Sequence, residues 1–324
     1  MLPGNLGQHV IGCRHLRGSR RAGAYQKRIP APAGRTAGLR GGRVLSRMMK
    51  AGWRTAIPAV AAMLPVLFGG SAAVASSTKI GGLYDITVAG LTVGRGTMSL
   101  VLQGNAYSAK VGIEPAGIGS VFSTGQGGAE ASGWLVGSKV VPSKYTMTSK
   151  AASRDFYVSL LQGSGSIRNF EATPPFKPVP DRVEVTRKHR QNAMDPLSAA
   201  LMPVSSGKEG LGPAACKRKL PVFDGWTRFD IQLSYKETRE VSGRGYDGPV
   251  VVCSAKWIPV AGHRPGREQV QQMASADIET WLAPMGRDDV LIPYRISIPT
   301  KSGQLVVEAS KLRLNGEGTD HAAR

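Results

Sequence analysis

Few side chains in this sequence have the types and spacing that acid–base catalysis needs. Asp224 and Asp230 lie close together in the chain, and His263 follows in a loop rich in Gly, Arg and Pro. Two carboxylates held about 5–9 Å apart can act as acid and base, and a histidine base needs a partner beside it. Aspartates next to glycine in turns usually cap backbone N–H groups instead, and the chain has no G-x-S-x-G or H-E-x-x-H motif. We therefore expect no enzyme and no catalytic residue, and keep His263, Asp224 and Asp230 as a candidate loop site.

A glycine-rich motif raises the question of a nucleotide cofactor. Residues 243–248 match the pattern G-x-G-x-x-G, which binds dinucleotides only where it follows a strand and opens a helix. Here Pro249 and the β-branched run 250–252 follow, which favours a hairpin turn. The sequence predicts no cofactor.

Two groups of basic residues offer a charged surface. They flank the helix expected in the middle of the chain, and their members are Arg187, Lys188, Arg190, Lys217, Arg218 and Lys219. Such clusters bind lipid phosphates or acidic polysaccharide through their positive potential, or they form an ordinary solvated face. Nucleic acid is not an expected partner, because aromatic residues make up only 6% of the chain and such binding uses interleaved exposed aromatics.

The two cysteines in the second half of the chain are expected to form a disulfide bond. Cys216 and Cys253 are the only cysteines after a predicted export signal, and an even pair in an exported chain is typical of a disulfide. This predicts Cα atoms about 4.4–6.8 Å apart. Two buried free thiols are the alternative. Two cysteines without a histidine at finger spacing do not make a zinc site, so no metal is expected.

That export signal is residues 48–75. Two basic residues open it, an apolar run follows over residues 56–68, and Ala-Val-Ala precedes Ser76, the expected mature start. The apolar run is too short for a membrane span of about 20 residues. We therefore expect a periplasmic protein with no integral membrane span after cleavage near Ala75.

The formal net charge of +20 is concentrated before and within this signal. Residues 1–54 hold 12 Lys and Arg and no acid, which leaves a net charge of +8 for the rest of the chain. Residues 1–47 are either a basic disordered extension or lie before a true start at Met48 or Met49.

The residues that carry this chemistry must be positioned mainly by strands. Across residues 76–315, short alternating apolar and polar runs are separated by Gly and Asn, which is the pattern of an antiparallel meander. Proline breaks the pattern over residues 173–181. Residues 195–202 begin with Asp and Pro, which favour a helix start, and residues 267–275 form a second short helix. We predict one mainly β domain, a curved sheet or open barrel with one or two short helices, followed by a polar tail at 316–324.

Several short motifs follow one another in a specific order. They are Asp195-Pro196-Leu197-Ser198-Ala199, Cys216 with Phe223-Asp224-Gly225, Arg228-Phe229-Asp230, Cys253, Pro259-Val260-Ala261-Gly262-His263 and Trp281-Leu282-Ala283-Pro284. With them the chain resembles the domain-of-unknown-function 3108 family of exported proteobacterial envelope proteins, over roughly residues 80–315. The resemblance implies a mostly antiparallel β protein and no known activity.

These expectations lead to two functions of different classes. In the first, the concave apolar face of the sheet, partly closed by the helix at 195–202, binds or carries a lipid or other amphiphile. In the second, the protein is a structural or adaptor protein of the cell envelope and binds another protein through a sheet edge or its basic face.

Overall fold

Fourteen strands dominate the computed structural model of this chain, which describes residues 77–122, 125–151, 154–243 and 245–314. The predicted signal peptide 48–75, residues 1–47 before it, the expected start at Ser76 and the tail 316–324 lie outside the described residues. All described residues belong to one compact unit. No helix within them is long and apolar enough to cross a membrane.

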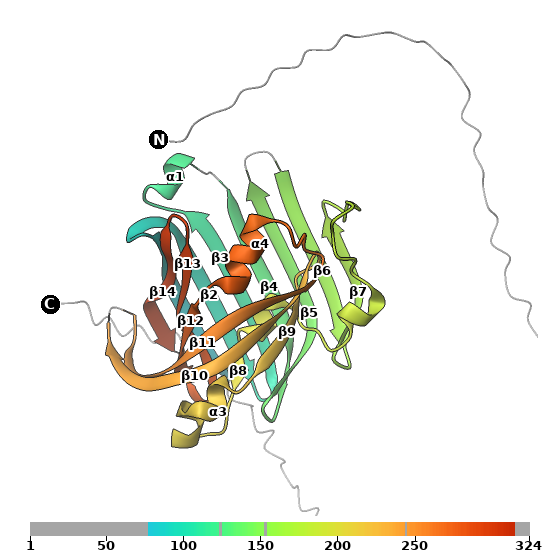
Figure 1. The fold of residues 1–324 in the computed structure, drawn as a ribbon. Helices are drawn as coiled ribbons and strands as arrows, with labels where there is room; N and C mark the ends of the chain where they lie inside the picture. Colours follow the sequence, from blue (N-terminus) through green and yellow to red (C-terminus); the bar gives the residue numbers. More distant parts are fainter. Residues whose placement is uncertain (1–76, 123–124, 152–153, 244, 315–324) are drawn as a thin grey trace, which may run out of the picture. The chain divides into compact units, whose positions relative to one another are not determined.

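The first half of the unit is a run of consecutive hairpins (Figure 1). Its elements are β1 (Ser77–Val88), β2 (Leu91–Gln103), β3 (Ala106–Pro115), α1 (Gly119–Phe122), β4 (Gln126–Val136), β5 (Lys139–Ala151), β6 (Arg154–Gly163) and β7 (Ser166–Thr173). Tight turns with left-handed backbone join most of these strands, as at Gly104, Gly137 and Gly165. Glycine meets no steric penalty in that conformation, so the glycine-punctuated sequence folds back strand by strand.

The second half begins with short helices and ends in long strands. Its elements are η1 (Arg187–Arg190), α2 (Pro196–Ala199), β8 (Met202–Pro203), η2 (Lys208–Leu211), α3 (Pro213–Cys216), β9 (Lys219–Phe223), β10 (Arg228–Ser242), β11 (Asp247–Ala261), α4 (Glu268–Ser275), β12 (Ile278–Met285), β13 (Arg287–Thr300) and β14 (Gly303–Leu314). The G-x-G-x-x-G motif joins β10 to β11, which confirms the predicted hairpin.

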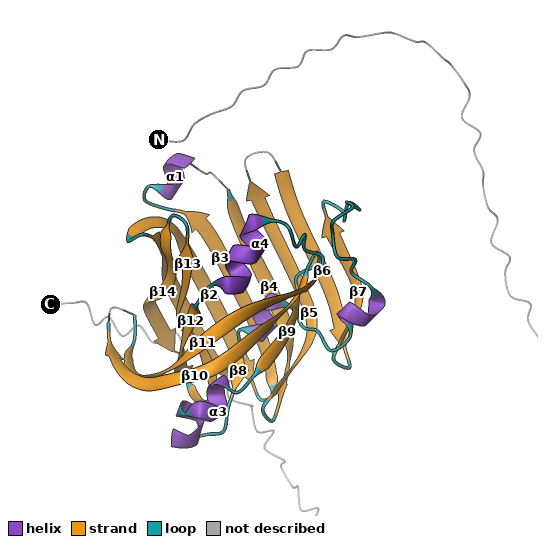
Figure 2. Cartoon of the chain, in the orientation of Figure 1, coloured by secondary structure: helices purple, strands orange, loops and turns teal. Residues whose placement is uncertain are grey.

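The strands form one antiparallel sheet that is not closed, in the order β7-β6-β5-β4-β3-β2-β1-β14-β13-β12-β11-β10-β9, with β8 paired to β13. The predicted meander is therefore confirmed (Figure 2). The end strands β7 and β9 do not pair with each other. Isolated bridges Ser166–Gln191 and Met194–Val222 instead place the segment 191–194 between them.

The predicted helix at 195–202 is present but shorter. Asp195 caps it and Pro196 opens it, as expected, and α2 packs against β4, β5 and β9. The helix ends at Ala199 because the chain then turns to pair Met202 and Pro203 with β13. The second predicted helix is α4, and the described residues contain four short α-helices rather than one or two.

The largest core cluster fills the curve of the sheet beside α2. It joins buried side chains of β1 to β7 with Phe223 of β9, Val290 and Ile292 of β13, and Leu201 just after α2. The apolar face of the sheet around α2 is therefore occupied by the protein's own side chains. Open space lies beside this core, where the loops meet.

Candidate functional site

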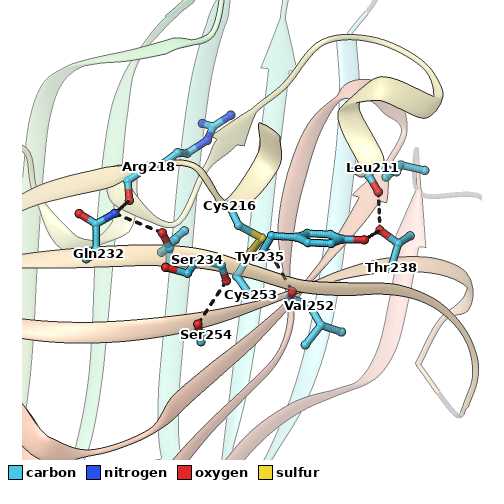
Figure 3. The surroundings of a disulfide bond; sticks show 11 residues. Leu211, Cys216, Arg218, Gln232, Ser234, Tyr235, Thr238, Val252, Cys253 and Ser254 are labelled. Carbon is cyan, nitrogen blue, oxygen red and sulfur yellow. Dashed lines mark hydrogen bonds between the residues drawn. A yellow bond between two sulfur atoms is a disulfide. The ribbon is translucent and has the colours of Figure 1, made fainter. Parts of the chain in front are cut away.

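The disulfide anchors one wall of the region around α2. Cys216 in α3 is bonded to Cys253 in β11, with Cα atoms 5.6 Å apart, so the predicted pair and its spacing are confirmed. Both cysteines are fully buried. Figure 3 shows Tyr235 of β10 beside the bond, and Thr238 donates a hydrogen bond to the carbonyl of Leu211 at 2.6 Å. The disulfide therefore fixes α3 against β11, and the hydrogen bond fixes the preceding loop against β10.

A buried polar cluster, here called the α2 network, fixes the helix itself. The Asp195 carboxylate accepts hydrogen bonds from the Ser198 N–H (2.8 Å), the Ser198 hydroxyl (2.6 Å) and the Gln162 amide (2.8 Å). The Ser198 and Tyr107 hydroxyls lie 2.6 Å apart. Burial raises the pKa of Asp195 and also that of Tyr107. The network is buried and fully hydrogen-bonded, so it positions α2 rather than offering a reactive group.

Beside α2 lies a cleft of about 690 Å³, here called the basic cleft. It is bounded by the β4–β5 turn, the segment after η1, the loop after α2 and the start of β9. Its lining residues include Lys139, Val140, Pro142, Met194, Leu201, Val204, Lys217, Arg218, Lys219, Leu220 and Pro221. The walls are thus mainly apolar and the charged members are all basic, with no acidic residue among the described lining residues.

The four basic side chains of this cleft are held in different ways. Arg218 donates to the carbonyl of Pro203, and burial lowers its pKa, although a guanidinium stays charged in proteins. Lys219 pairs with Asp230 at 2.8 Å. Lys139 and Lys217 are exposed, and neither makes an ion pair with another described residue. Two charges are therefore anchored at the cleft and two are available to an incoming anion.

The candidate loop site does not assemble. The Asp224 carboxylate accepts hydrogen bonds from the N–H groups of Trp226 (2.8 Å) and Thr227 (2.6 Å), which is turn capping. Burial works to raise the pKa of Asp230, but hydrogen bonds from Lys219 and Arg228 outweigh it and hold the pKa below its usual value. The ring Nδ1 of His263 is buried and has no hydrogen-bond partner among the described residues, so it is not bonded to either carboxylate. Each residue therefore has a separate, structural setting.

The two predicted groups of basic residues lie in two different places. Lys217, Arg218 and Lys219 line the basic cleft, whereas Arg187 and Arg190 lie on η1, beside β7. Lys188 lies between Arg187 and Arg190 on η1 and is exposed. Sequence reasoning missed Lys139 and the apolar wall of the β4–β5 turn, because they lie about 80 residues from Lys217 in the chain. No group of His, Cys, Asp and Glu among the described residues could hold a metal ion.

Comparison with known proteins gives a family but no activity. The family described as "Protein of unknown function (DUF3108)" matches residues 83–310. A crystal structure of a beta-barrel-like protein of the domain of unknown function DUF1849 from Brucella abortus is similar with a TM-score of 0.44 and 10% identity, over 74% of this chain and 98% of that one. Among curated proteins there is no match.

Proposed function

The chain belongs to the DUF3108 family of proteins of unknown function. We propose that it is an exported envelope protein that binds an anionic amphiphile in the basic cleft. The observation that carries the proposal is the composition of this cleft, which combines apolar walls with four basic side chains. Ligand sites are mostly apolar with a few polar groups that fix the orientation of the ligand.

The charged head group of the ligand meets Lys139, Lys217 and Arg218. A phosphate or carboxylate accepts charge-assisted hydrogen bonds from ammonium and guanidinium groups, and these are about twice as strong as neutral ones. Because Arg218 is already held by a backbone carbonyl, its guanidinium is positioned before the ligand arrives. Lys139 at the start of β5 and Lys217 directly after α3 are far apart in the sequence. Both ammonium groups contact the head group of the bound ligand.

The hydrocarbon part of the ligand lies along the apolar walls. Val140 and Leu201 pack on or belong to the main core cluster, and Leu220 packs on the cluster that contains the disulfide. Val140 and Leu220 are half-buried, and covering their remaining surface contributes about 25 cal/mol per Å². The same surface gives no advantage to a short or purely ionic ligand.

Export is part of the proposal and rests on the sequence and the disulfide. Residues 48–75 have the signal-peptide pattern, and disulfides persist in oxidising compartments such as the periplasm. No acid–base pair forms from the candidate loop residues, which favours binding over catalysis. Edman sequencing of the protein from its own envelope tests this part, and an N-terminus other than one near Ser76 would contradict it.

Titration calorimetry with three compounds that differ in charge and chain length tests the ligand class. We expect dodecyl phosphate, below its micelle concentration, to bind one-to-one. Butyl phosphate loses the apolar contacts and dodecyltrimethylammonium has the wrong charge, so each should bind at least tenfold more weakly. Equal affinity for the cationic detergent would contradict the assignment of the cleft to an anion.

Charge reversal tests the location of the site. The double variant Lys139→Glu/Lys217→Glu should weaken dodecyl phosphate binding at least tenfold, because it places two negative charges beside the head group. Lys256→Glu is the matched control, since Lys256 is an exposed lysine of β11 outside the cleft. An equal loss in the control would show only a general effect of net charge.

A second candidate function is an envelope adaptor that binds another protein. The observation that favours it is a set of exposed aliphatic side chains around α1: Leu91, Ile113, Ile118 and Val121. Large exposed apolar groups in one place commonly mark an interaction surface. Photo-crosslinking from position 120 in intact cells should then trap one protein reproducibly, whereas crosslinking from position 256 should not.

A further inference from the structure

The strip between the two end strands of the sheet carries a second cleft system, which we call the seam. The chain from Pro174 to Arg190 runs along it. Trp226 donates through its ring N–H to the carbonyl of Pro174 at 2.9 Å, and Arg264 pairs with Asp181 at 2.7 Å. The Val183 N–H donates to the carbonyl of His263 at 3.0 Å. These contacts hold the segment against the loops that follow β9 and β11.

One part of the seam is a cleft of about 490 Å³ with aromatic walls. Phe170 of β7 meets Phe223 of β9 edge to face, with ring centroids 5.4 Å apart, and Phe176 lines the same cleft. The Arg182 guanidinium lies 4.5 Å from the centroid of Phe176, and that of Arg190 lies 5.1 Å from the centroid of Phe170. Flat apolar walls are thus combined with two stacked cations.

Arg182 lines this cleft and also has a buried, unused hydrogen-bond donor. Its Nε is buried and has no hydrogen-bond partner among the described residues. Because this atom is buried, it does not face the open space of the cleft, and Arg182 contributes its charge and its stacking on Phe176 instead. Glu184 is the one carboxylate among the described lining residues, and it leaves the pair of arginines with a net positive charge.

The second part of the seam is a polar cleft of about 410 Å³ that shares Arg190 with the first. Arg168 and Arg187 also line it, together with Ser164, Ser166 and Gln191. Arg168 is held by the Ser164 hydroxyl at 2.8 Å. No acidic residue occurs among its described lining residues. Three guanidinium groups with serine hydroxyls match the oxygen atoms of a phosphate, sulfate or carboxylate.

We propose that the seam is a second binding site, for a small aromatic oxyanion. The ring of the ligand lies against Phe170 and Phe176, and its oxyanion reaches past Arg190 to Arg168 and Arg187. Arginine suits this arrangement because its planar group stacks on a ring and donates to an anion at once. The seam shares no lining residue with the basic cleft, so this site does not depend on the amphiphile proposal.

Fluorescence titration with 1-naphthyl phosphate tests the ligand class. We expect saturable one-to-one binding, and similar binding of naphthalene-1-sulfonate, because both carry a flat ring and an oxyanion. Inorganic phosphate lacks the ring and 1-naphthylmethylamine has a positive charge, so each should bind at least tenfold more weakly. No saturable binding of 1-naphthyl phosphate, or equal binding of inorganic phosphate, overturns the proposal.

Arginine variants test the location of the site. Arg190→Gln should weaken 1-naphthyl phosphate binding at least tenfold and leave dodecyl phosphate binding unchanged, while Arg190→Lys should recover part of the loss. Arg187→Gln changes an exposed side chain and keeps the test valid if Arg190→Gln fails to fold. Arg239→Gln is the matched control, because Arg239 of β10 lies 5.2 Å from the Trp281 ring, away from the seam. An equal loss in Arg239→Gln, or no loss in Arg190→Gln and Arg187→Gln, overturns the proposal.

Discussion

The two ends of strands β2, β3 and β4 differ in how the side chains there are held. Figure 1 shows α1 and α3 at opposite ends of these strands. On the α3 side, Tyr107 is buried and hydrogen-bonded to Ser198, and the Cys216–Cys253 bond ties α3 to β11. At the end nearest α1, Ile113 is 54% exposed and Val121 is 78% exposed. The same meander therefore supplies one end with long-range bonds and leaves the other with unpacked aliphatic groups.

This difference indicates that the α3 end contributes most to stability and holds the ligand cleft, whereas the α1 end is free to contact a partner. The α3 end contains the basic cleft, and a cleft must keep its shape for a ligand to find pre-positioned groups. Its fixed parts are the α2 network and the disulfide. The α1 end carries little of the packing, so substitutions there should affect partners more than stability.

Removal of the disulfide should have the largest effect on the α3 end. The bond joins residues 37 positions apart, and loop-closure entropy gives it about 3–4 kcal/mol of stabilisation. The double variant Cys216→Ala/Cys253→Ala should lose about this free energy of unfolding, measured by urea denaturation. A loss below about 1 kcal/mol would show that packing alone fixes α3.

Truncation of the α2 network should have the next largest effect on stability. Asp195→Ala removes the acceptor of three hydrogen bonds and leaves Gln162 and Ser198 without it. Each buried unsatisfied group costs about 1–3 kcal/mol, so we expect a loss of about 3 kcal/mol in urea unfolding. Asp155→Ala on β6 is the control, since Asp155 is exposed, and it should stay within about 0.5 kcal/mol.

The same carboxyl should leave a pH signature. Burial raises the pKa of Asp195, so the folded protein holds this proton more tightly than the unfolded chain. Its contribution is fully present below the unfolded pKa of about 3.9 and is lost as the pH rises through the raised folded pKa. Asp195→Asn does not titrate, so the wild type should lose stability relative to this variant as the pH rises above about 4. Groups with lowered pKa, such as Asp230, act in both proteins and cancel in the difference. A constant difference between the two proteins would contradict the prediction.

Substitution of Gly133, which pairs with Tyr107 between β3 and β4, should have a smaller effect on stability at the same end. A Cβ atom at Gly133 would lie 2.3 Å from the carbonyl oxygen of Val141 and 2.9 Å from the Tyr107 ring. Gly133→Ala should therefore cost about 2 kcal/mol, because overpacking moves the backbone or the ring. Gly81→Ala is the matched control in β1, where no atom lies within 4 Å of the added carbon. Thermal unfolding of both variants gives the comparison, and equal shifts would contradict it.

The sequence predicted those parts of the α3 end that depend on residue type and local order. Two cysteines after an export signal indicated the disulfide, and Asp195 before Pro196 indicated the helix start. The partners of Asp195 and Ser198 were beyond reach, because Gln162 and Tyr107 come from other strands, 33 and 91 residues away. The two basic groups were recognised by charge, but only the fold places one of them at the basic cleft and the other at the seam. Lys139 joins the cleft through the register of β4 and β5, which a single sequence does not specify.

The smallest effect on stability is expected at the α1 end. Ile118 is 44% exposed, and its N–H donates to the carbonyl of Thr92 at 3.1 Å, so the backbone rather than the side chain attaches α1 to β2. The double variant Ile118→Ser/Val121→Ser should therefore change the free energy of unfolding by no more than about 0.5 kcal/mol. A loss above about 1 kcal/mol would show that these side chains are packed, and the contrast between the two ends would fail. Unchanged stability combined with loss of the crosslink from position 120 would instead show that the exposed side chains serve a partner, which is the adaptor function in its most specific form.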